Sequence, residues 1–183
     1  MRLRAGLLGV ILLVYELTAR FHPYVPWQPG WSALDRRIPF VEAAFFVYAS
    51  YYLLLAGGLL ALQGAELARA ARQLLLALGS AAAVFILLPV DLPPGSVPAG
   101  AGARFIYDFL MRADTSANTF PSLHAALALL TGWAVARARP GWGRWATAWA
   151  WAVAASTVLT KRHFAADLGG GIALAWACRT AVR

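Results

Sequence analysis

Apolar residues are distributed along the chain in six long stretches, which shorter polar connections separate. The stretches cover roughly residues 3–19, 40–62, 74–90, 121–136, 145–160 and 163–177. Each approaches the length of about 20 residues that an α-helix needs to cross a bilayer, although the last three are shorter. The longest connection, residues 91–120, is rich in proline and glycine. The pattern predicts an all-α membrane protein, a bundle of six transmembrane helices that forms a single domain over residues 1–183.

The composition strengthens this interpretation. Of the 183 residues, 61% are hydrophobic and 13% are charged, and the mean hydropathy is +0.62. Soluble domains contain about 45–50% apolar and about 25% charged residues. The single cysteine, Cys178, excludes an internal disulfide and a cysteine-based zinc site. The net charge is +8, but the chain has no soluble basic domain, so we expect membrane lipids and not nucleic acid as partners.

The charged residues also suggest an orientation in the membrane. With six spans, both termini and the connections 63–73 and 137–144 lie on one side, together with nine of the 16 Lys and Arg residues and one acid, Glu66. Cytoplasmic loops carry an excess of Lys and Arg, which favours cytoplasmic termini. The first stretch ends without a small-x-small cleavage site, so we expect it to remain as a span.

The strongest candidate site lies where the sixth apolar stretch begins. His163 and Asp167 are four residues apart, a spacing that places both on one face of a helix. Asp167 can then accept a hydrogen bond from one ring nitrogen of His163 and leave the other nitrogen free to attack. Ionisable groups at membrane depth are costly and usually face a cavity or a partner. The alternative is a purely structural pair inside the bundle.

A second histidine, His124, begins the fourth apolar stretch, where Pro121 suits the first turn of a helix. Because the fourth and sixth stretches run in the same direction, His124 and His163 lie at the same membrane level, on the outer face. The third histidine, His22, lies in a loop rich in Pro and Trp and looks incidental. Two histidines, an aspartate and nearby cations suit phosphate chemistry: cations hold the anion, one imidazole attacks phosphorus, and the other protonates the departing oxygen.

The segments FPSLHA (120–125) and TKRHFAAD (160–167), with glycines at 169–171, resemble two signature motifs of the type-2 phosphatidic acid phosphatase superfamily. The closer likeness is to its inositol phosphorylceramide synthase-like branch, which similarly has Pro-Ser-Leu-His. The resemblance implies a six-helix membrane enzyme that acts on lipid phosphates or diphosphates without a metal or another cofactor. It implies that His163 is the nucleophile, that Asp167 orients it, and that His124 protonates the leaving alcohol. Ser122 would help to bind phosphate, together with the amides that begin the fourth helix.

The chain departs from the superfamily pattern in its phosphate-binding cations. The first motif of the superfamily, a Lys followed seven residues later by Arg-Pro, is absent, and Thr157 stands where the second motif has Arg. The phosphate must therefore be held by other cations, for which the candidates are Lys161, Arg162, Arg104 and Arg112.

Structural alternatives exist for several of these residues. Lys161 and Arg162 could be interfacial anchors, and Ser122 could cap a helix as well as bind phosphate. We expect the three glycines at 169–171 to allow close helix packing and not to contact substrate. Glu16 and Glu42 lie near the outer ends of the first two spans, but a role in the site is the weaker interpretation for them.

Three classes of function are consistent with the sequence. The motifs favour a lipid phosphatase or phosphotransferase. An intramembrane serine protease would pair Ser122 with His163, but Ser122 lacks a Gly-x-Ser element and the presence of His124 is then unexplained. The third class is a non-catalytic transporter or scaffold. The motifs handle phosphorus and not the acceptor, and only the connection 91–120 is long enough to build a second pocket. We therefore predict a lipid phosphatase, with a phosphotransferase as the alternative.

Overall fold

The computed structural model of the chain describes residues 2–21, 23–93, 96–111 and 118–182, and these residues form helices joined by short connections. In these ranges, strand-like pairing is limited to isolated bridges that join Trp27 and Asn118 to Val90. The all-α prediction is therefore confirmed for the described part of the chain. The helices are α1 (Arg2–Arg20), α2 (Ala33–Arg37), α3 (Ala44–Ala49), α4 (Tyr51–Ala61), α5 (Gly64–Leu87), α6 (Ala101–Met111), α7 (Leu123–Ala138), α8 (Pro140–Leu159) and α9 (Ala165–Ala181).

Each of the six apolar stretches is helical, but the third begins earlier than predicted. Helix α5 starts at Gly64 and not near Leu74. Residues 64–73 read GAELARAARQ, and Ala, Leu, Glu, Arg and Gln are strong helix formers. Polar side chains are compatible with the first turns of this helix, where Glu66 accepts a hydrogen bond of 2.6 Å from Arg137 Nε. The predicted connection over 63–73 was wrong, since only residues 62 and 63 separate α4 from α5.

The long connection over 91–120 contains the additional helix α6. This helix is 11 residues long, too short to have registered as a span. Its Leu110 packs into a small cluster with Phe45 and Tyr48 of α3, and the same face covers the start of the second apolar stretch. A further short helix, α2, lies in the connection between the first and second apolar stretches. It begins with a capping box formed by Ser32 and Asp35.

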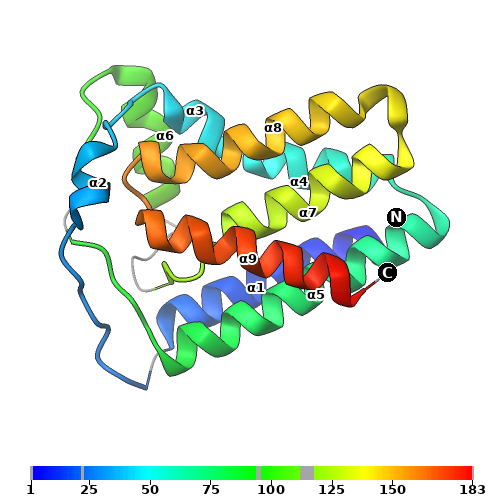
Figure 1. Ribbon diagram of the computed structural model, residues 1–183, viewed down its shortest axis with the longest axis horizontal. Coiled ribbons are helices and arrows are strands. Elements are labelled where there is room, and N and C mark those ends of the chain that lie inside the picture. Colours follow the sequence, from blue (N-terminus) through cyan, green and yellow to red (C-terminus); the bar gives the residue numbers. More distant parts are fainter. Residues whose placement is uncertain (1, 22, 94–95, 112–117, 183) are drawn as a thin grey trace.

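Helix α7 lies at the centre of the bundle, in contact with α4, α5, α8 and α9 (Figure 1). It is buried around its circumference and not on one stripe, because Ala125–Leu130 are all at most 2% exposed. Small residues allow the close approach: a Cβ at Gly132 would lie 2.6 Å from Ala150 Cβ of α8. In a bilayer such van der Waals packing, and not the hydrophobic effect, holds helices together.

The helices alternate in direction, so the turns fall at two ends of the bundle. Figure 1 shows both termini at the same end as the α4–α5 and α7–α8 turns. At this end Arg4 Nε donates a hydrogen bond of 2.8 Å to Leu59 O, and Arg137 pairs with Glu66. The opposite end holds α2, α6 and the starts of α7 and α9, which is where both histidine motifs lie.

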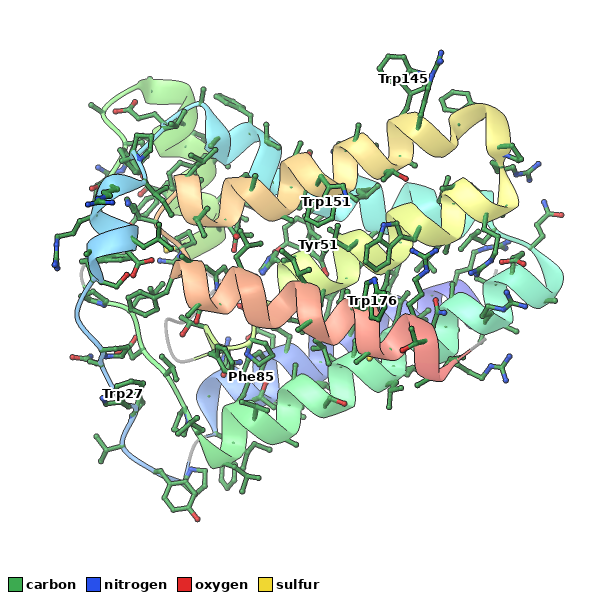
Figure 2. The ribbon with its side chains drawn as sticks, in the orientation of Figure 1. Trp27, Tyr51, Phe85, Trp145, Trp151 and Trp176 are labelled. Atoms are coloured by element: carbon green, nitrogen blue, oxygen red, sulfur yellow. The ribbon has the colours of Figure 1, made fainter. Side chains whose placement is uncertain are left out.

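Two stretches, Ala44–Ala61 and Gly64–Leu87, are long and apolar enough to cross a membrane, and α7 is apolar but shorter. Large apolar side chains also face outward on other helices: Trp145 and Trp151 of α8 and Trp176 of α9 are exposed, whereas Tyr51 and Phe85 are buried (Figure 2). Exposed apolar surface of this extent marks a membrane or protein contact. These features are consistent with a membrane protein.

Candidate active site

His163 lies in the turn between α8 and α9, where the chain reverses. The backbone N–H groups of Arg162 and His163 both donate to Thr157 O, at 3.1 Å each, which fixes the turn as α8 ends. Lys161 adopts a positive φ of 57°, the left-handed conformation that lets the chain turn there. Helix α9 begins only at Ala165, so the prediction that His163 is itself part of the sixth helix was wrong.

The predicted contact between His163 and Asp167 is nevertheless present. Nδ1 of His163 lies 3.4 Å from Oδ2 of Asp167, and the two residues are 6% and 2% exposed. Asp167 occupies the third position of α9, from which its Oδ2 also accepts a hydrogen bond of 2.9 Å from Phe164 N. A carboxylate at this position folds back over the helix start. It thereby reaches His163, which immediately precedes the cap.

His124 belongs to the first turn of α7. Ser122 is the N-cap of this helix, and its Oγ accepts a hydrogen bond of 3.4 Å from Ala125 N. The capping interpretation of Ser122 is thus confirmed, and the side chain is fully buried beside His124. Pro121 precedes the cap and does not lie in the first helical turn as predicted, because the helix begins at Leu123.

Two glycines of α9 bring the histidine segments together. A Cβ at Gly171 would lie 2.5 Å from Ser122 O, and one at Gly170 would lie 2.7 Å from the ring of Phe120. Any larger residue would push α9 away from the start of α7. Ser122 N also donates a hydrogen bond of 3.0 Å to Asp167 O. The predicted packing role is confirmed for these two glycines, whereas the Cβ position of Gly169 faces open space.

The imidazoles of His124 and His163 are consequently close, with ring centroids 6.2 Å apart. Neither is exposed by more than 7%. A phosphoryl group between two such rings would have one nitrogen on each side of phosphorus. This arrangement can support attack from one side and proton donation from the other.

Four tyrosines surround His124, a grouping that the sequence did not predict. The ring centroids of Tyr51 and Tyr48 lie 4.7 and 4.8 Å from the centroid of the His124 imidazole. Those of Tyr15 and Tyr52 lie farther out, at 6.0 and 6.5 Å. The hydroxyl of Tyr48 is 3.5 Å from His124 Nδ1. Tyr48, Tyr51 and Tyr52 follow helical spacing of three and four residues, a signal that was visible in the aromatic run over 45–52.

Asp35 was also missed. It is 4% exposed, and its Oδ1 accepts a hydrogen bond of 2.7 Å from Ala165 N at the start of α9. Lys161 donates through Nζ to the backbone carbonyls of Asp35 and Ile38, and it lies 5.6 Å from the ring of Trp31. Burial raises the pKa of Asp35, but hydrogen bonds from Ala165 and Ser32, together with the charge of Lys161, outweigh it and hold this pKa below its ordinary value. Helix α2 is thereby fastened to the segment that carries His163.

The other predicted cations are placed differently. Arg104 lies on α6 in an ion pair of 2.9 Å with Asp108, and both side chains are about half exposed. The described contacts that join the two histidines do not extend to it. Arg162 is half-buried beside His163. Arg112 and His22 lie outside the described residues.

Neither Glu16 nor Glu42 joins the histidines through a described contact. Glu16 pairs with Arg20 at 2.8 Å, and Glu42 accepts hydrogen bonds from Ala99 N and Gly100 N at the start of α6. Among the residues that the structure describes, no group of three His, Cys, Asp or Glu side chains is placed to hold a metal ion.

Comparison with known proteins agrees with the two motifs. The family model of the PAP2 superfamily matches residues 22–181, which is most of the chain and includes His124 and His163. No curated protein and no solved structure gives a significant match. The match does not distinguish branches within the superfamily, but membership supports a phosphatase-type function. The chain belongs to the PAP2 superfamily.

Proposed function

We propose that the protein is an integral membrane phosphatase that hydrolyses lipid phosphates or diphosphates through a phosphohistidine intermediate. The observation that carries this proposal is the pair of buried imidazoles 6.2 Å apart, one of which faces a carboxylate. A buried His–Asp pair beside a second buried histidine is costly to fold, and catalysis accounts for it better than packing does.

In the first step, Asp167 accepts the Nδ1–H of His163, which leaves the lone pair on Nε2 directed at phosphorus. The N–P bond forms while the P–O bond to the lipid alcohol breaks. His124 gives its proton to the departing oxygen, so that the lipid leaves as a neutral alcohol.

In the second step, His124 is neutral and takes a proton from water. The water oxygen attacks phosphorus, the N–P bond breaks, and inorganic phosphate is released. The phosphate oxygens face the amino end of α7, where backbone amides and Ser122 supply donors. Cations complete this site, and Lys161, Arg162, Arg104 and Arg112 remain the candidates.

The decisive assay incubates the purified protein with phosphatidic acid, an isoprenyl diphosphate or phosphatidylinositol, each with and without an added alcohol. We expect free phosphate as the main product in both conditions, from the first two substrates. Formation of a new phosphodiester that depends on the alcohol, with negligible free phosphate, would instead identify the phosphotransferase that resembles the synthase-like branch. If none of these substrates is turned over, both the phosphatase and the phosphotransferase proposals are contradicted.

We further propose that α1, the α3–α4 stretch, α5, α7, α8 and α9 are six spans and that the histidines lie at the outer membrane face. The basic end, with Arg137 and Arg139, would then be cytoplasmic. Single cysteines at Arg104 and Arg139 test this in intact cells with a membrane-impermeant maleimide, since the native Cys178 is buried. We expect labelling at Arg104 alone, and labelling at Arg139 alone would reverse the orientation.

A further inference from the structure

An apolar groove begins at the imidazole of His124 and runs away from His163. A small cavity of about 30 Å³ is lined by His124, Tyr15 and Leu123, and also by four residues of α1 and α4. A second cavity of about 190 Å³ shares those four residues and continues to Leu8, Leu55 and Ala56. The shared residues are Ile11, Leu12, Tyr51 and Tyr52. The two cavities therefore form one path between α1 and α4, which we name the α1–α4 groove.

The packing of α1 explains why this groove exists. Helix α1 lies mainly along α5 and makes few contacts with α4. Ile11 and Tyr51 form the floor of the groove and are at most 5% exposed, whereas Leu12 and Tyr52 at its rim are 53% and 41% exposed. The groove therefore opens on the flank of the bundle, where α1 and α4 face the surroundings of the helices and not another helix.

We propose that the α1–α4 groove holds the hydrocarbon chain of the leaving lipid alcohol, an inference that rests on the proposed function. Attacking and leaving atoms lie roughly in line on opposite sides of phosphorus in phosphoryl transfer. If His163 attacks, the leaving oxygen and the chain attached to it must lie on the side of His124. The groove starts there and is apolar beyond the tyrosines.

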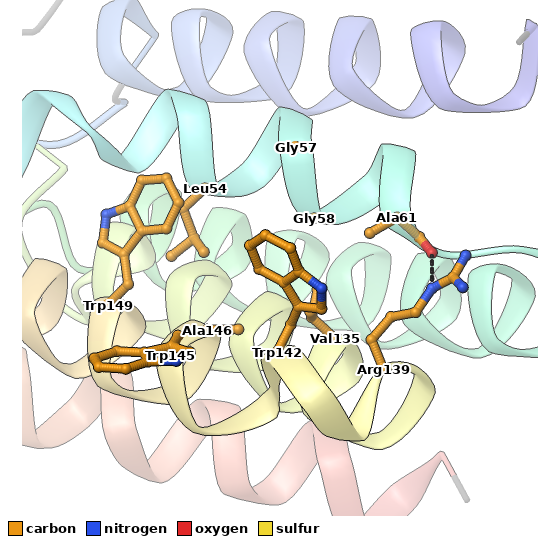
Figure 3. A pocket seen from close by; sticks show the side chains of 10 residues that line it. All are labelled: Leu54, Gly57, Gly58, Ala61, Val135, Arg139, Trp142, Trp145, Ala146 and Trp149. Carbon is orange, nitrogen blue, oxygen red and sulfur yellow. Dashed lines mark hydrogen bonds between the residues drawn. The ribbon is translucent and has the colours of Figure 1, made fainter.

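Two larger cavities do not lie on the side of His124 from which the hydrocarbon chain would leave. A larger cavity of about 580 Å³ touches Asp167 and Phe164 and so lies behind the nucleophile. Another, of about 510 Å³, lies between α4 and α8, where the ring of Trp142 lies opposite Gly57 and Gly58 and that of Trp149 lies near Leu54 (Figure 3). Its far end reaches Arg139, which donates a hydrogen bond of 3.2 Å to Ala61 O. Histidine does not line it.

The groove predicts a preference for chain length. Tyr51 and Ala56 are five residues apart on α4, which corresponds to about 8 Å at about 1.5 Å rise per residue. A short alkyl group would stay near the tyrosines, whereas a long chain would pass Ala56. Enlarging the side chain at Ala56 should therefore harm long-chain substrates and spare short ones.

The adjacent residue supplies a matched control. Gly57 follows Ala56 on the same helix but lines the cavity between α4 and α8. A Cβ at Gly57 would have no neighbour within 4 Å. We compare Ala56→Trp with Gly57→Trp, using hexadecyl phosphate and butyl phosphate in detergent micelles and measuring free phosphate. Ala56→Trp should lower kcat/KM for hexadecyl phosphate by about tenfold or more, with butyl phosphate within about twofold. Gly57→Trp should leave kcat/KM unchanged for both substrates.

Equal losses for both substrates in Ala56→Trp, or the same chain-length effect in Gly57→Trp, would overturn the proposal. A second measurement does not depend on turnover or on a bulky substitution. In a His163→Ala background, hexadecyl phosphate should slow maleimide labelling of Ala56→Cys but not of Gly57→Cys. Equal labelling with and without hexadecyl phosphate would also overturn it. Absence of phosphate release by the native protein, with protection at Ala56→Cys retained, would reject the proposed function and leave the groove assignment standing.

Discussion

Among the described contacts, His163 is held by a carboxylate and a backbone carbonyl, and those of His124 include aromatic rings and a tyrosine hydroxyl. On the first side, Asp167 contacts the imidazole, and Thr157 O holds its backbone N–H. On the second side, Tyr48 and Tyr51 pack on the ring, and the hydroxyl of Tyr48 lies 3.5 Å from Nδ1. Both histidines are buried within the same end of the bundle.

This difference fits a division of labour. A nucleophile must keep one nitrogen aimed at phosphorus, and a carboxylate on the other nitrogen fixes both tautomer and direction. An acid that later becomes a base must gain and lose a proton at the nitrogen that faces the substrate, and its ring must stay in place while it does so. The tyrosine rings packed on His124 restrict the orientation of its imidazole. Substitutions at the two histidines and their neighbours should therefore have different effects on turnover.

The first prediction concerns the nucleophile. His163→Ala should reduce phosphate release to the background level, because the proposed mechanism forms the covalent bond to phosphorus at this imidazole. Acid quenching of the native enzyme with phosphorus-labelled substrate should trap phosphohistidine, and the variant should trap none. His22→Ala offers the same substitution at a histidine outside both motifs, and it should keep native turnover. Persistent turnover in His163→Ala would disprove the mechanism.

The second prediction concerns the orienting carboxylate. Asp167→Asn should leave slow turnover, since a carboxamide can still accept from Phe164 N but no longer favours the required tautomer. The corresponding change at another His-orienting aspartate lowers kcat about 10⁴-fold. Measured with the same substrate, kcat should fall to this extent while the melting temperature stays within a few degrees. Full activity in Asp167→Asn would mean that the contact with His163 is only structural.

These two residues show what sequence reasoning can reach. Both lie within five residues of each other, so their contact is local and the spacing alone predicted it. The spacing suggested a shared helical face, whereas the structure uses a carboxylate at the third position of α9 that folds back over the cap. The helices around the site were likewise predictable, because apolar periodicity is a local signal.

Asp35 and the tyrosines were beyond such reasoning. Asp35 reaches Ala165 across 130 positions of sequence, and Tyr48 reaches His124 across 76. Such contacts depend on how helices are arranged in space, which a single sequence does not determine. Lys161 was grouped with the phosphate-binding cations because of its position beside His163, but its ammonium group donates to carbonyls near α2.

The third prediction concerns the acid. His124→Ala should lower turnover of lipid phosphates by about 10² to 10⁴-fold, the usual contribution of general acid–base catalysis. With nitrophenyl phosphate, whose leaving group needs no proton, the first step should proceed and phosphohistidine should accumulate, because the second step lacks its base. Quench-flow with labelled substrate measures both. Loss of the trapped intermediate would show that His124 is needed for attack or binding.

The fourth prediction concerns the contact between α2 and the turn that carries His163. If Lys161 positions this turn, Lys161→Met should lower kcat by about 10- to 100-fold with little change in KM, since a displacement near 1 Å costs about that much. If Lys161 instead holds phosphate, KM should rise. Lys161→Arg should restore kcat in the first case because Arg can donate to the same carbonyls, and Arg162→Met provides the matched loss of charge at the next residue.

Because Asp35 is titratable, the contact between α2 and the start of α9 should make the stability of the protein depend on pH. Its pKa is lowered in the folded protein, so its contribution to the free energy of unfolding is complete above the ordinary aspartate pKa of about 4 and is lost as the pH falls through the lower, folded value. The melting temperature of the native protein in detergent should therefore fall on acidification below about pH 4. Asp35→Asn should have a lower melting temperature at neutral pH and a shallower acid-induced decline. Parallel declines in the two proteins would mean that Asp35 does not fasten α2 to the start of α9, and the kcat loss expected for Lys161→Met would then need another cause.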